Sequence, residues 1–110
     1  MKSEIKQKWL DALRSGKYKQ SYGYLYNPNK EGIYPVGYCC FGVLCEVTNI
    51  EKDDKNEAYI FDGMKMYSRV PTGFCDLNQL DICDLMSMND SRNHNFKSIA
   101  NFIEVNIPVD

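Results

Sequence analysis

The chain has 110 residues, of which 44% are hydrophobic and 25% are charged, and its net charge is −2. A chain of this length can bury a conventional core without metal or disulfide staples, so we expect a single domain over residues 1–110. The interspersed charges argue against a general binder of duplex nucleic acid, which would present a basic face, but they leave room for a local basic patch. No apolar stretch approaches the roughly 18 residues that a membrane span needs.

The cysteines and the N-terminus indicate a reducing compartment. Five cysteines is an odd number, and the adjacent Cys39 and Cys40 are poor disulfide partners, so reduced thiols are expected. The first residues lack the apolar run of a secretory signal, and we therefore expect a cytoplasmic protein. The cysteine spacing contains no paired C-x₂-C motif, which disfavours a structural zinc site.

An amphipathic pattern predicts a first helix over residues 3–15, with Ser3 as its N-cap and Gly16 as its end. We expect Trp9 on this helix to pack in the core, where indole fits well. The apolar face consists of Ile5, Trp9, Leu10, Ala12 and Leu13.

From residue 17 the pattern changes to a period of two, which predicts a strand over residues 17–26. A turn over residues 27–32 and a return strand over residues 33–38 would complete a hairpin, in which Pro35 confines the second strand to an edge. The rings of the first strand either pack across strands or form a wall on which a planar ligand stacks. One side of that strand would carry Tyr18, Gln20, Tyr22, Tyr24 and Tyr26.

Residues 39–45 carry three of the five cysteines in an uncharged run that follows Gly37. Their apolar positions cover more than the stripe of a surface helix, which indicates a buried helix. We expect this helix to lie in the middle of the fold.

The next segment combines a loop and a hairpin. The charged run over residues 51–57 has mixed signs, which predicts a solvated loop without a function. Residues 58–61 and 64–67 flank Asp62-Gly63, a dipeptide that supplies the positive φ angles of a type I′ hairpin turn.

A third helix is expected to begin at an Asp76 cap, with Gln79 reaching back to it, and to end near Met88. A polar turn over residues 89–94 would follow. Asn95 would then cap a last helix, whose apolar face repeats at helical spacing. This face consists of Phe96, Ile99, Ala100 and Ile103, and Pro108 closes the helix.

The order of these elements is helix, hairpin, buried helix, hairpin and two helices. This order is typical of an α+β domain. We expect a small antiparallel sheet of two hairpins, covered by about four helices around a buried central helix.

Three blocks of the sequence stand out by their joint order. They are Trp9-Leu10-x-Ala12-Leu13-Arg14-Ser15-Gly16-Lys17-Tyr18-x-Gln20, Tyr38-Cys39-Cys40-x-Gly42-Val43-Leu44-Cys45, and Met88-Asn89-Asp90 with Phe96-x-x-Ile99-Ala100-x-x-Ile103-Glu104. Together they resemble a group of small, largely phage-encoded proteins of uncharacterised function. The resemblance implies a protein made during infection in the host cytoplasm, and it brings no established activity.

The chain departs from the pattern of this group at three places. Phe41 stands where leucine is usual, and the residue before Asn89 is also usually leucine. The turn between Asp90 and Phe96 is longer than in the group, and it contains His94, the only histidine.

The start of the central helix is the candidate anion site. Its free amides would receive a phosphate, nearby basic side chains would add charge, tyrosine rings would stack on a base, and polar side chains would bind sugar hydroxyls. We therefore expect a non-enzymatic protein, without cofactor or metal, that sequesters a nucleotide-derived molecule such as a defence signal. The candidate ligand-binding residues are Arg14, Lys17, Tyr18, Gln20, Tyr22, Cys39, Cys40, Phe41, Gly42, Asn89 and Asp90, with Lys19 and Tyr24 as further candidates.

Structural roles stay open for several of these residues. Asn89 and Asp90 fit a turn whose side chains bond their own backbone, and Gln20 fits the polar face of an edge strand. Arg14 fits a charge that complements the C-terminus of the first helix.

Two other functions remain as alternatives. An exposed tyrosine face would suit a protein-binding module that inhibits a host factor, and an edge strand with many rings would also suit a homodimer. A thiol-dependent enzyme is less favoured: Cys39 or Cys40 at a helix N-terminus would be activated, but the only imidazole, His94, lies in a polar turn.

Overall fold

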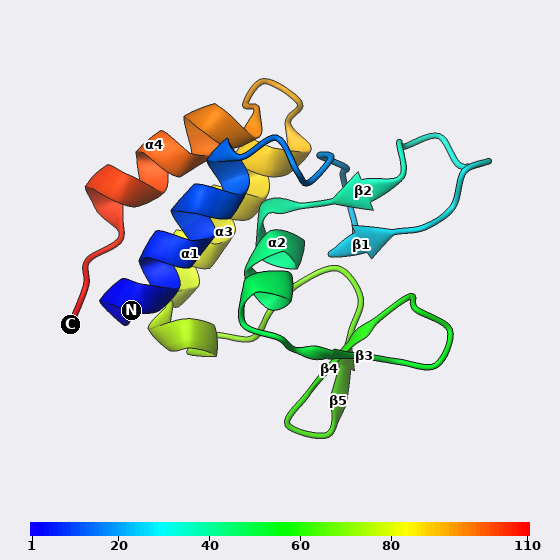
Figure 1. Ribbon diagram of the computed structural model, residues 1–110, viewed down its shortest axis with the longest axis horizontal. Coiled ribbons are helices and arrows are strands. Elements are labelled where there is room, and N and C mark those ends of the chain that lie inside the picture. The colour runs from blue at the N-terminus through cyan, green and yellow to red at the C-terminus, as the bar shows by residue number, and fades with distance from the viewer.

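The computed structural model describes all residues from 1 to 110, and it contains four α-helices and two small antiparallel sheets (Figure 1). The predicted α+β class, with helices around a buried central one, is confirmed. None of the helices combines the length and the apolar character that crossing a membrane requires. The helices are α1 (Ser3–Arg14), α2 (Cys40–Val47), α3 (Gln79–Asp90) and α4 (Phe96–Asn106), and a 3₁₀ turn, η1, spans Phe74–Asp76.

The two hairpins belong to two separate sheets. In the first sheet β1 (Tyr26–Asn27) pairs antiparallel with β2 (Gly37–Tyr38). In the second sheet β4 pairs with both of its neighbours, in the order β3-β4-β5. The strands of the second sheet are β3 (Glu51–Lys52), β4 (Tyr59–Phe61) and β5 (Met64–Met66).

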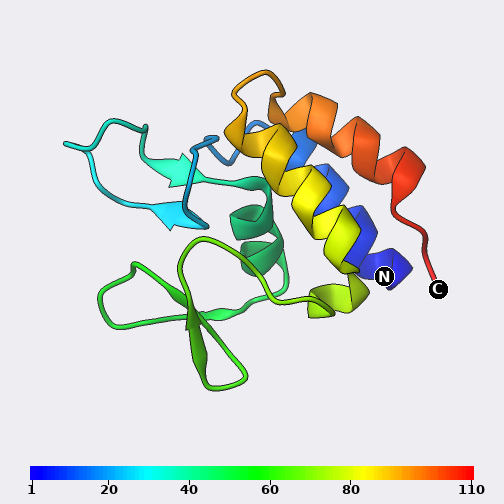
Figure 2. The same ribbon diagram turned by 180° about the vertical axis from the view of Figure 1, so that it is seen from behind.

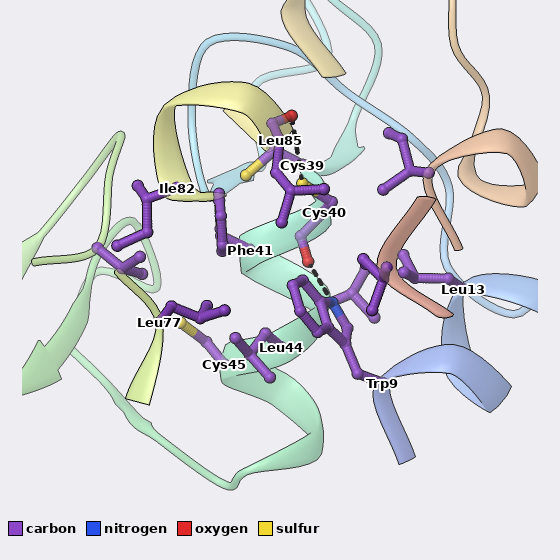
Figure 3. Packing of buried hydrophobic residues seen from close by; sticks show 14 of the residues in the cluster. Trp9, Leu13, Cys39, Cys40, Phe41, Leu44, Cys45, Leu77, Ile82 and Leu85 are labelled. Carbon is purple, nitrogen blue, oxygen red and sulfur yellow. Dashed lines mark hydrogen bonds between the residues drawn. The ribbon is translucent and has the colours of Figure 1, made fainter. Parts of the chain in front are cut away.

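Helix α2 lies between the other helices and the two sheets (Figures 1 and 2). Helix α1 packs against α2 and α4, and α3 packs against the same two helices. All residues of α2 from Cys40 to Cys45 are buried, and all of them except Gly42 belong to a hydrophobic core of 23 buried residues. Figure 3 shows this helix surrounded by side chains from α1, from α3 and from the segment before α3. The predicted position of the central helix is confirmed.

Helix α1 forms as its apolar pattern predicts, and Trp9 joins it to α2. The indole is fully buried, and its Nε1 donates a hydrogen bond of 2.9 Å to the carbonyl oxygen of Cys40 (Figure 3). The predicted cap is wrong, because the helix includes Ser3 and follows Lys2, whose side chain makes no capping bond.

The long tyrosine strand predicted over residues 17–26 is wrong. Only its last residue is in a strand, because Gly23 adopts a φ of 82°, which breaks the extended backbone. The backbone amides of this segment are bonded to different parts of the fold. The amide of Ser21 donates to the oxygen of Tyr38 at 2.7 Å, and that of Leu25 donates to the oxygen of Tyr67 at 2.8 Å.

The charged run over residues 51–57 is only partly a solvated loop. Lys52 in β3 pairs with Tyr59 in β4, which adds a third strand beside the predicted hairpin. Asp53 is buried, and its Oδ1 accepts bonds from two backbone amides that close the following turn. The predicted type I′ turn is confirmed, since Asp62 and Gly63 have φ angles of 52° and 76°.

Helix α3 begins later than predicted and ends later. Asp76 has a φ of 63° inside η1, so it does not cap the helix. Asn78 is the cap, and its side-chain oxygen accepts from the amide of Asp81 at 2.8 Å. The helix continues through Asn89 and Asp90, which were predicted in a turn. The next cap is correctly predicted, because Asn95 accepts from the amide of Ser98 at 2.9 Å.

Candidate functional site

The N-terminus of α2, the predicted anion site, is closed by the protein itself. The amide of Cys40 donates a hydrogen bond of 3.2 Å to Oδ1 of Asn89. Phe41 and Gly42 are buried, and a Cβ atom added to Gly42 would lie 1.8 Å from the carbonyl oxygen of Leu25. The space beside Cys39 and Cys40 has no room for a water molecule. The structure therefore leaves no space for the ligand predicted at residues 39–42.

Asn89 uses its hydrogen-bonding capacity to join segments that are far apart in the sequence. Besides the bond from Cys40, its Oδ1 accepts from Nε2 of Gln20 at 3.1 Å. Its Nδ2 donates to the carbonyl oxygen of Ser21 at 3.0 Å and to Oδ1 of Asp90 at 3.2 Å. The side chain is fully buried, and a buried amide with these partners is a structural link rather than a contact for sugar hydroxyls.

Two further bonds extend this network. Oδ1 of Asp90 accepts from the amide of Gly23 at 3.1 Å, and Nε2 of Gln20 donates to the carbonyl oxygen of His94 at 3.0 Å. The network therefore fixes residues 20–23 against the C-terminal end of α3. Three of the predicted ligand residues, Gln20, Asn89 and Asp90, are close together, but they bind one another.

Tyr22 lies apart from this network. Its ring packs edge-on against Tyr34 with centroids 6.0 Å apart, and the guanidinium of Arg92 lies 5.2 Å from its centroid. The predicted base-stacking role for this ring was paired with a phosphate at the start of α2, where the structure leaves no space.

The thiols at the start of α2 are poor nucleophiles. Burial raises the pKa of Cys39 to about 12, although the backbone amides of Gly42 and Phe41 oppose that rise. Burial also raises the pKa of Cys40 well above its ordinary value. Both side chains lie among apolar residues in Figure 3. A protonated, buried thiol does not attack a substrate, so the thiol hypothesis loses its physical basis.

A second concave site, which we call the basic groove, lies between the end of α1 and the start of α4. It has a volume of about 760 Å³. Four cations line it and no carboxylate does, although the chain as a whole carries a net charge of −2. The lining residues are Leu13, Arg14, Ser15, Gly16, Lys17, Tyr18, Lys19, Gln20, Asn95, Phe96 and Lys97.

The turn after α1 shapes one wall of the basic groove. Gly16 has a φ of 79°, which lets the chain reverse at the end of the helix. Ser15 holds the turn, since its hydroxyl donates to the oxygen of Ala12 at 2.7 Å and accepts from the amide of Lys17 at 3.1 Å. This turn places Lys17 and Lys19 at the groove.

The first turn of α4 forms the other wall. The side chain of Asn95 caps the amide of Ser98, which leaves the amides of Phe96 and Lys97 without a partner inside the helix. The positive end of the α4 dipole therefore lies at the basic groove, where it adds to the positive charge of the lysines.

The four cations differ in how freely they can meet a ligand. Nη2 of Arg14 is bonded to Oδ1 of Asn101 at 2.9 Å and to Oε2 of Glu104 at 3.0 Å, so its charge is partly neutralised. None of the ion pairs in the structure involves Lys17, Lys19 or Lys97. These three amines are the free positive charges of the groove.

Tyr18 presents a fixed aromatic ring at the same place. Its ring is half-buried and packs edge-on against Tyr38 with centroids 5.3 Å apart. Nζ of Lys17 lies 5.6 Å from the centroid of the Tyr18 ring. An aromatic surface therefore adjoins the free amines.

The sequence of residues 1–80 matches the profile of a family described as a domain of unknown function, DUF8296. The match covers more than half of the chain. The chain belongs to the DUF8296 family. No curated protein and no solved structure matches it.

The part of this DUF8296 chain that matches the profile includes only one wall of the basic groove. The match contains the end of α1 and the turn with Lys17, Tyr18 and Lys19, whereas Asn95 and Lys97 on α4 lie beyond it. Both walls are present in this member, and together they make the concave site.

The structure brings four of the eleven predicted ligand residues to the groove of this DUF8296 member: Arg14, Lys17, Tyr18 and Gln20. Sequence reasoning missed Lys97, because no local pattern shows that α4 begins beside the end of α1. One signal was present. A lysine in the first turn of a helix opposes the helix dipole, so its position indicates a role other than helix stability.

Proposed function

We propose that this DUF8296 member is a non-enzymatic binding protein that captures a phosphate-bearing, nucleotide-like molecule in the basic groove. The observation that carries the proposal is the group of Arg14, Lys17, Lys19 and Lys97 around one concave site without a carboxylate. In a chain with a net charge of −2, such a local excess of positive charge favours an anionic ligand.

The groove offers the contacts that a nucleotide needs. Its volume of about 760 Å³ is within the range of small-molecule sites. The amines of Lys17 and Lys97 and the free amides at the start of α4 can donate to phosphate oxygens. The ring of Tyr18 supplies a surface on which a base can stack.

The resemblance to small, largely phage-encoded proteins suggests a biological setting for this binding. A protein made during infection that holds a nucleotide without converting it would lower the free concentration of that molecule. We therefore propose that the ligand is a nucleotide-derived signal of host defence.

Thermal-shift screening and calorimetry with ATP, a cyclic dinucleotide and ADP-ribose test the proposal. At least one of these should stabilise the protein, while adenosine, which lacks phosphate, should not. The double variant Lys17→Gln, Lys97→Gln should weaken binding at least tenfold, because two amines that face the phosphates are lost. Raising the salt concentration should also weaken binding, since these amines are exposed.

The matched control is Lys55→Gln, which removes an exposed lysine from the loop between β3 and β4. This variant should bind like the unaltered protein. Equal binding of adenosine and ATP, or unchanged affinity in the double variant, would contradict the proposal.

A second candidate function is the protein-binding module that inhibits a host factor. Tyr24 and Tyr67 are 50% and 47% exposed, and they line a cleft of about 220 Å³ together with Tyr26 and Pro28. Exposed tyrosines at a cleft are typical of protein interfaces. This function predicts a complex in host lysate that Tyr24→Ala with Tyr67→Ala abolishes and Lys17→Gln with Lys97→Gln leaves intact.

A further inference from the structure

The ammonium of Lys52 lies among three tyrosine rings from three different strands. Its Nζ is 4.6 Å from the ring centroid of Tyr26 on β1 and 5.7 Å from the ring centroids of Tyr38 on β2 and Tyr59 on β4. Glu46 on α2 completes the surroundings, since its Oε2 is 3.1 Å from the same Nζ. We call Tyr26, Tyr38, Tyr59 and Glu46 the tyrosine cage.

The tyrosine cage consists of two pairs of residues, and each pair has a contact that does not involve Lys52. The hydroxyl of Tyr59 donates a hydrogen bond of 2.7 Å to Oε2 of Glu46, and Tyr59 is fully buried. The rings of Tyr26 and Tyr38 pack against each other with centroids 4.8 Å apart. Each of these two pairs is therefore held by a contact of its own that does not involve Lys52.

The cage has the chemistry that recognises alkylammonium groups. Aromatic faces attract a cation through their ring quadrupoles, and several rings around one position are the usual way in which proteins bind quaternary ammonium. The carboxylate of Glu46 adds a full negative charge at the same place. Burial lowers the pKa of Lys52, but the hydrogen bond and the charge of Glu46 outweigh burial and raise it. The Lys52 amine in the cage is therefore cationic.

Lys52 lies at an edge of the fold, from which its side chain would leave the cage without unfolding the chain. It belongs to β3, a two-residue strand at the edge of its sheet. The side chains of Lys52 and Glu46 are 24% and 25% exposed, so solvent reaches the ion pair in the cage. Rotation about the flexible stem of the lysine would expose the rings.

We propose that the tyrosine cage is a binding site for the alkylammonium group of a small ligand, and that Lys52 is its tethered occupant, which an incoming ammonium replaces. This site is separate from the basic groove. It would take a cationic head group, whereas the groove would take an anion.

The test compares choline with 3,3-dimethylbutan-1-ol, a neutral molecule of the same shape, by calorimetry on Lys52→Ala. Removing the occupant should let choline bind at least tenfold more tightly than it binds the unaltered protein. Choline should also bind at least tenfold more tightly than the alcohol, because only the cation gains from the rings and the carboxylate. Adding Tyr26→Leu to Lys52→Ala should abolish the binding.

A measurement on the unaltered protein keeps the proposal testable even where Lys52→Ala does not fold. Ring currents should shift the ε-methylene protons of Lys52 upfield in the NMR spectrum. A high concentration of choline should move these signals towards the values of an exposed lysine, while sodium chloride of equal ionic strength should not.

Two outcomes would overturn the proposal. One is Lys52→Ala binding choline no better than the alcohol, which would mean that the cage only supports its own lysine. The other is Lys52 signals that respond to choline and to sodium chloride alike. An unaltered basic groove with a failed cage test would leave the nucleotide proposal standing, since the two sites share no residue.

Discussion

Asn89 is the single side chain on which the arrangement of the middle of the fold most depends. It receives the first amide of α2 and the side chain of Gln20, and it donates to the backbone of Ser21. These partners come from two separate parts of the sequence, residues 20–21 and the start of α2, and the side chain that joins them is fully buried. A polar group in this position stabilises the fold only while all its partners are present.

Replacing Asn89 by alanine should therefore lower the free energy of unfolding by about 3 kcal/mol, because buried donors and an acceptor lose their partners. Urea denaturation measures the change. The matched control is Asn93→Ala in the exposed turn after α3, where a change within about 0.5 kcal/mol is expected.

Asn89→Asp separates the two halves of the amide. An aspartate can still accept from Cys40, but it cannot donate to Ser21, and it adds a negative charge beside Asp90. It should be destabilising as well. A loss below about 1 kcal/mol in Asn89→Ala would show that the network contributes little to stability.

The partners of Asn89 also show a limit of prediction from the sequence. The Asn89-Asp90 pair is typical of a turn, and its polar character was read correctly, but its partner is the start of a helix about fifty positions earlier in the chain. A side chain's distant hydrogen-bond partner is not encoded in its neighbours. The same limit applies to Cys40. Its position at a helix start predicts a reactive thiol, but the fold buries it completely.

Among the elements, local patterns succeed where the element is regular. Apolar patterns and capping signals predicted the four helices, although α3 begins and ends later than expected, and Asp62-Gly63 correctly located a hairpin turn. The alternating pattern over residues 17–26 failed, because this segment bends at Gly23 and its amides bond first to β2 and then to the residue after β5. An alternation of residue types indicates that every second side chain is buried, and an irregular segment can show the same alternation as a strand.

The start of α3 provides a test of which residue caps this helix. Asn78→Ala should destabilise the protein by about 1 kcal/mol, since the amide of Asp81 loses its cap. Asp76→Gly should change stability by no more than about 0.5 kcal/mol, because Asp76 caps nothing and glycine tolerates its positive φ. Thermal and urea unfolding of both variants measure this difference, and the reverse order of effects would mean that the helix begins at Asp76.

For the whole molecule, the decisive feature is a core built around a helix rich in cysteine. The buried thiols fill space as small hydrophobic groups, and the surrounding helices and sheets exclude water from them. The close packing of α1 against α4 that completes this core also creates the basic groove at one end of the pair. The homodimer that the edge strand and the aromatic rings suggested in the sequence remains a prediction.

Alkaline pH should destabilise this core. Burial raises the pKa of Cys39 to about 12 and raises the pKa values of Cys40 and Cys45 above the ordinary range. In the unfolded chain these thiols ionise from about pH 9, whereas the folded chain keeps their protons. Unfolding then releases protons, so stability is retained below the ordinary thiol pKa and falls as the pH rises above it.

Urea unfolding in a reducing buffer between pH 7 and pH 10 measures this slope. Cys45→Ala should make the fall above pH 9 shallower by about 1 kcal/mol per pH unit, because one buried thiol no longer takes part. The control replaces the exposed Cys83 by alanine. An equal slope in Cys45→Ala and the unaltered protein would contradict the assignment.

The sequence by itself determined the helices, the tight hairpin and the buried character of the central helix. These depend on spacing, caps and turn residues that act within a few positions of one another. Only the tertiary structure decided that Asn89 closes the start of α2 and that Lys97 joins Lys17 in one groove. Hydrogen bonding and local charge depend on which distant segments approach each other, and packing of the whole chain determines that approach.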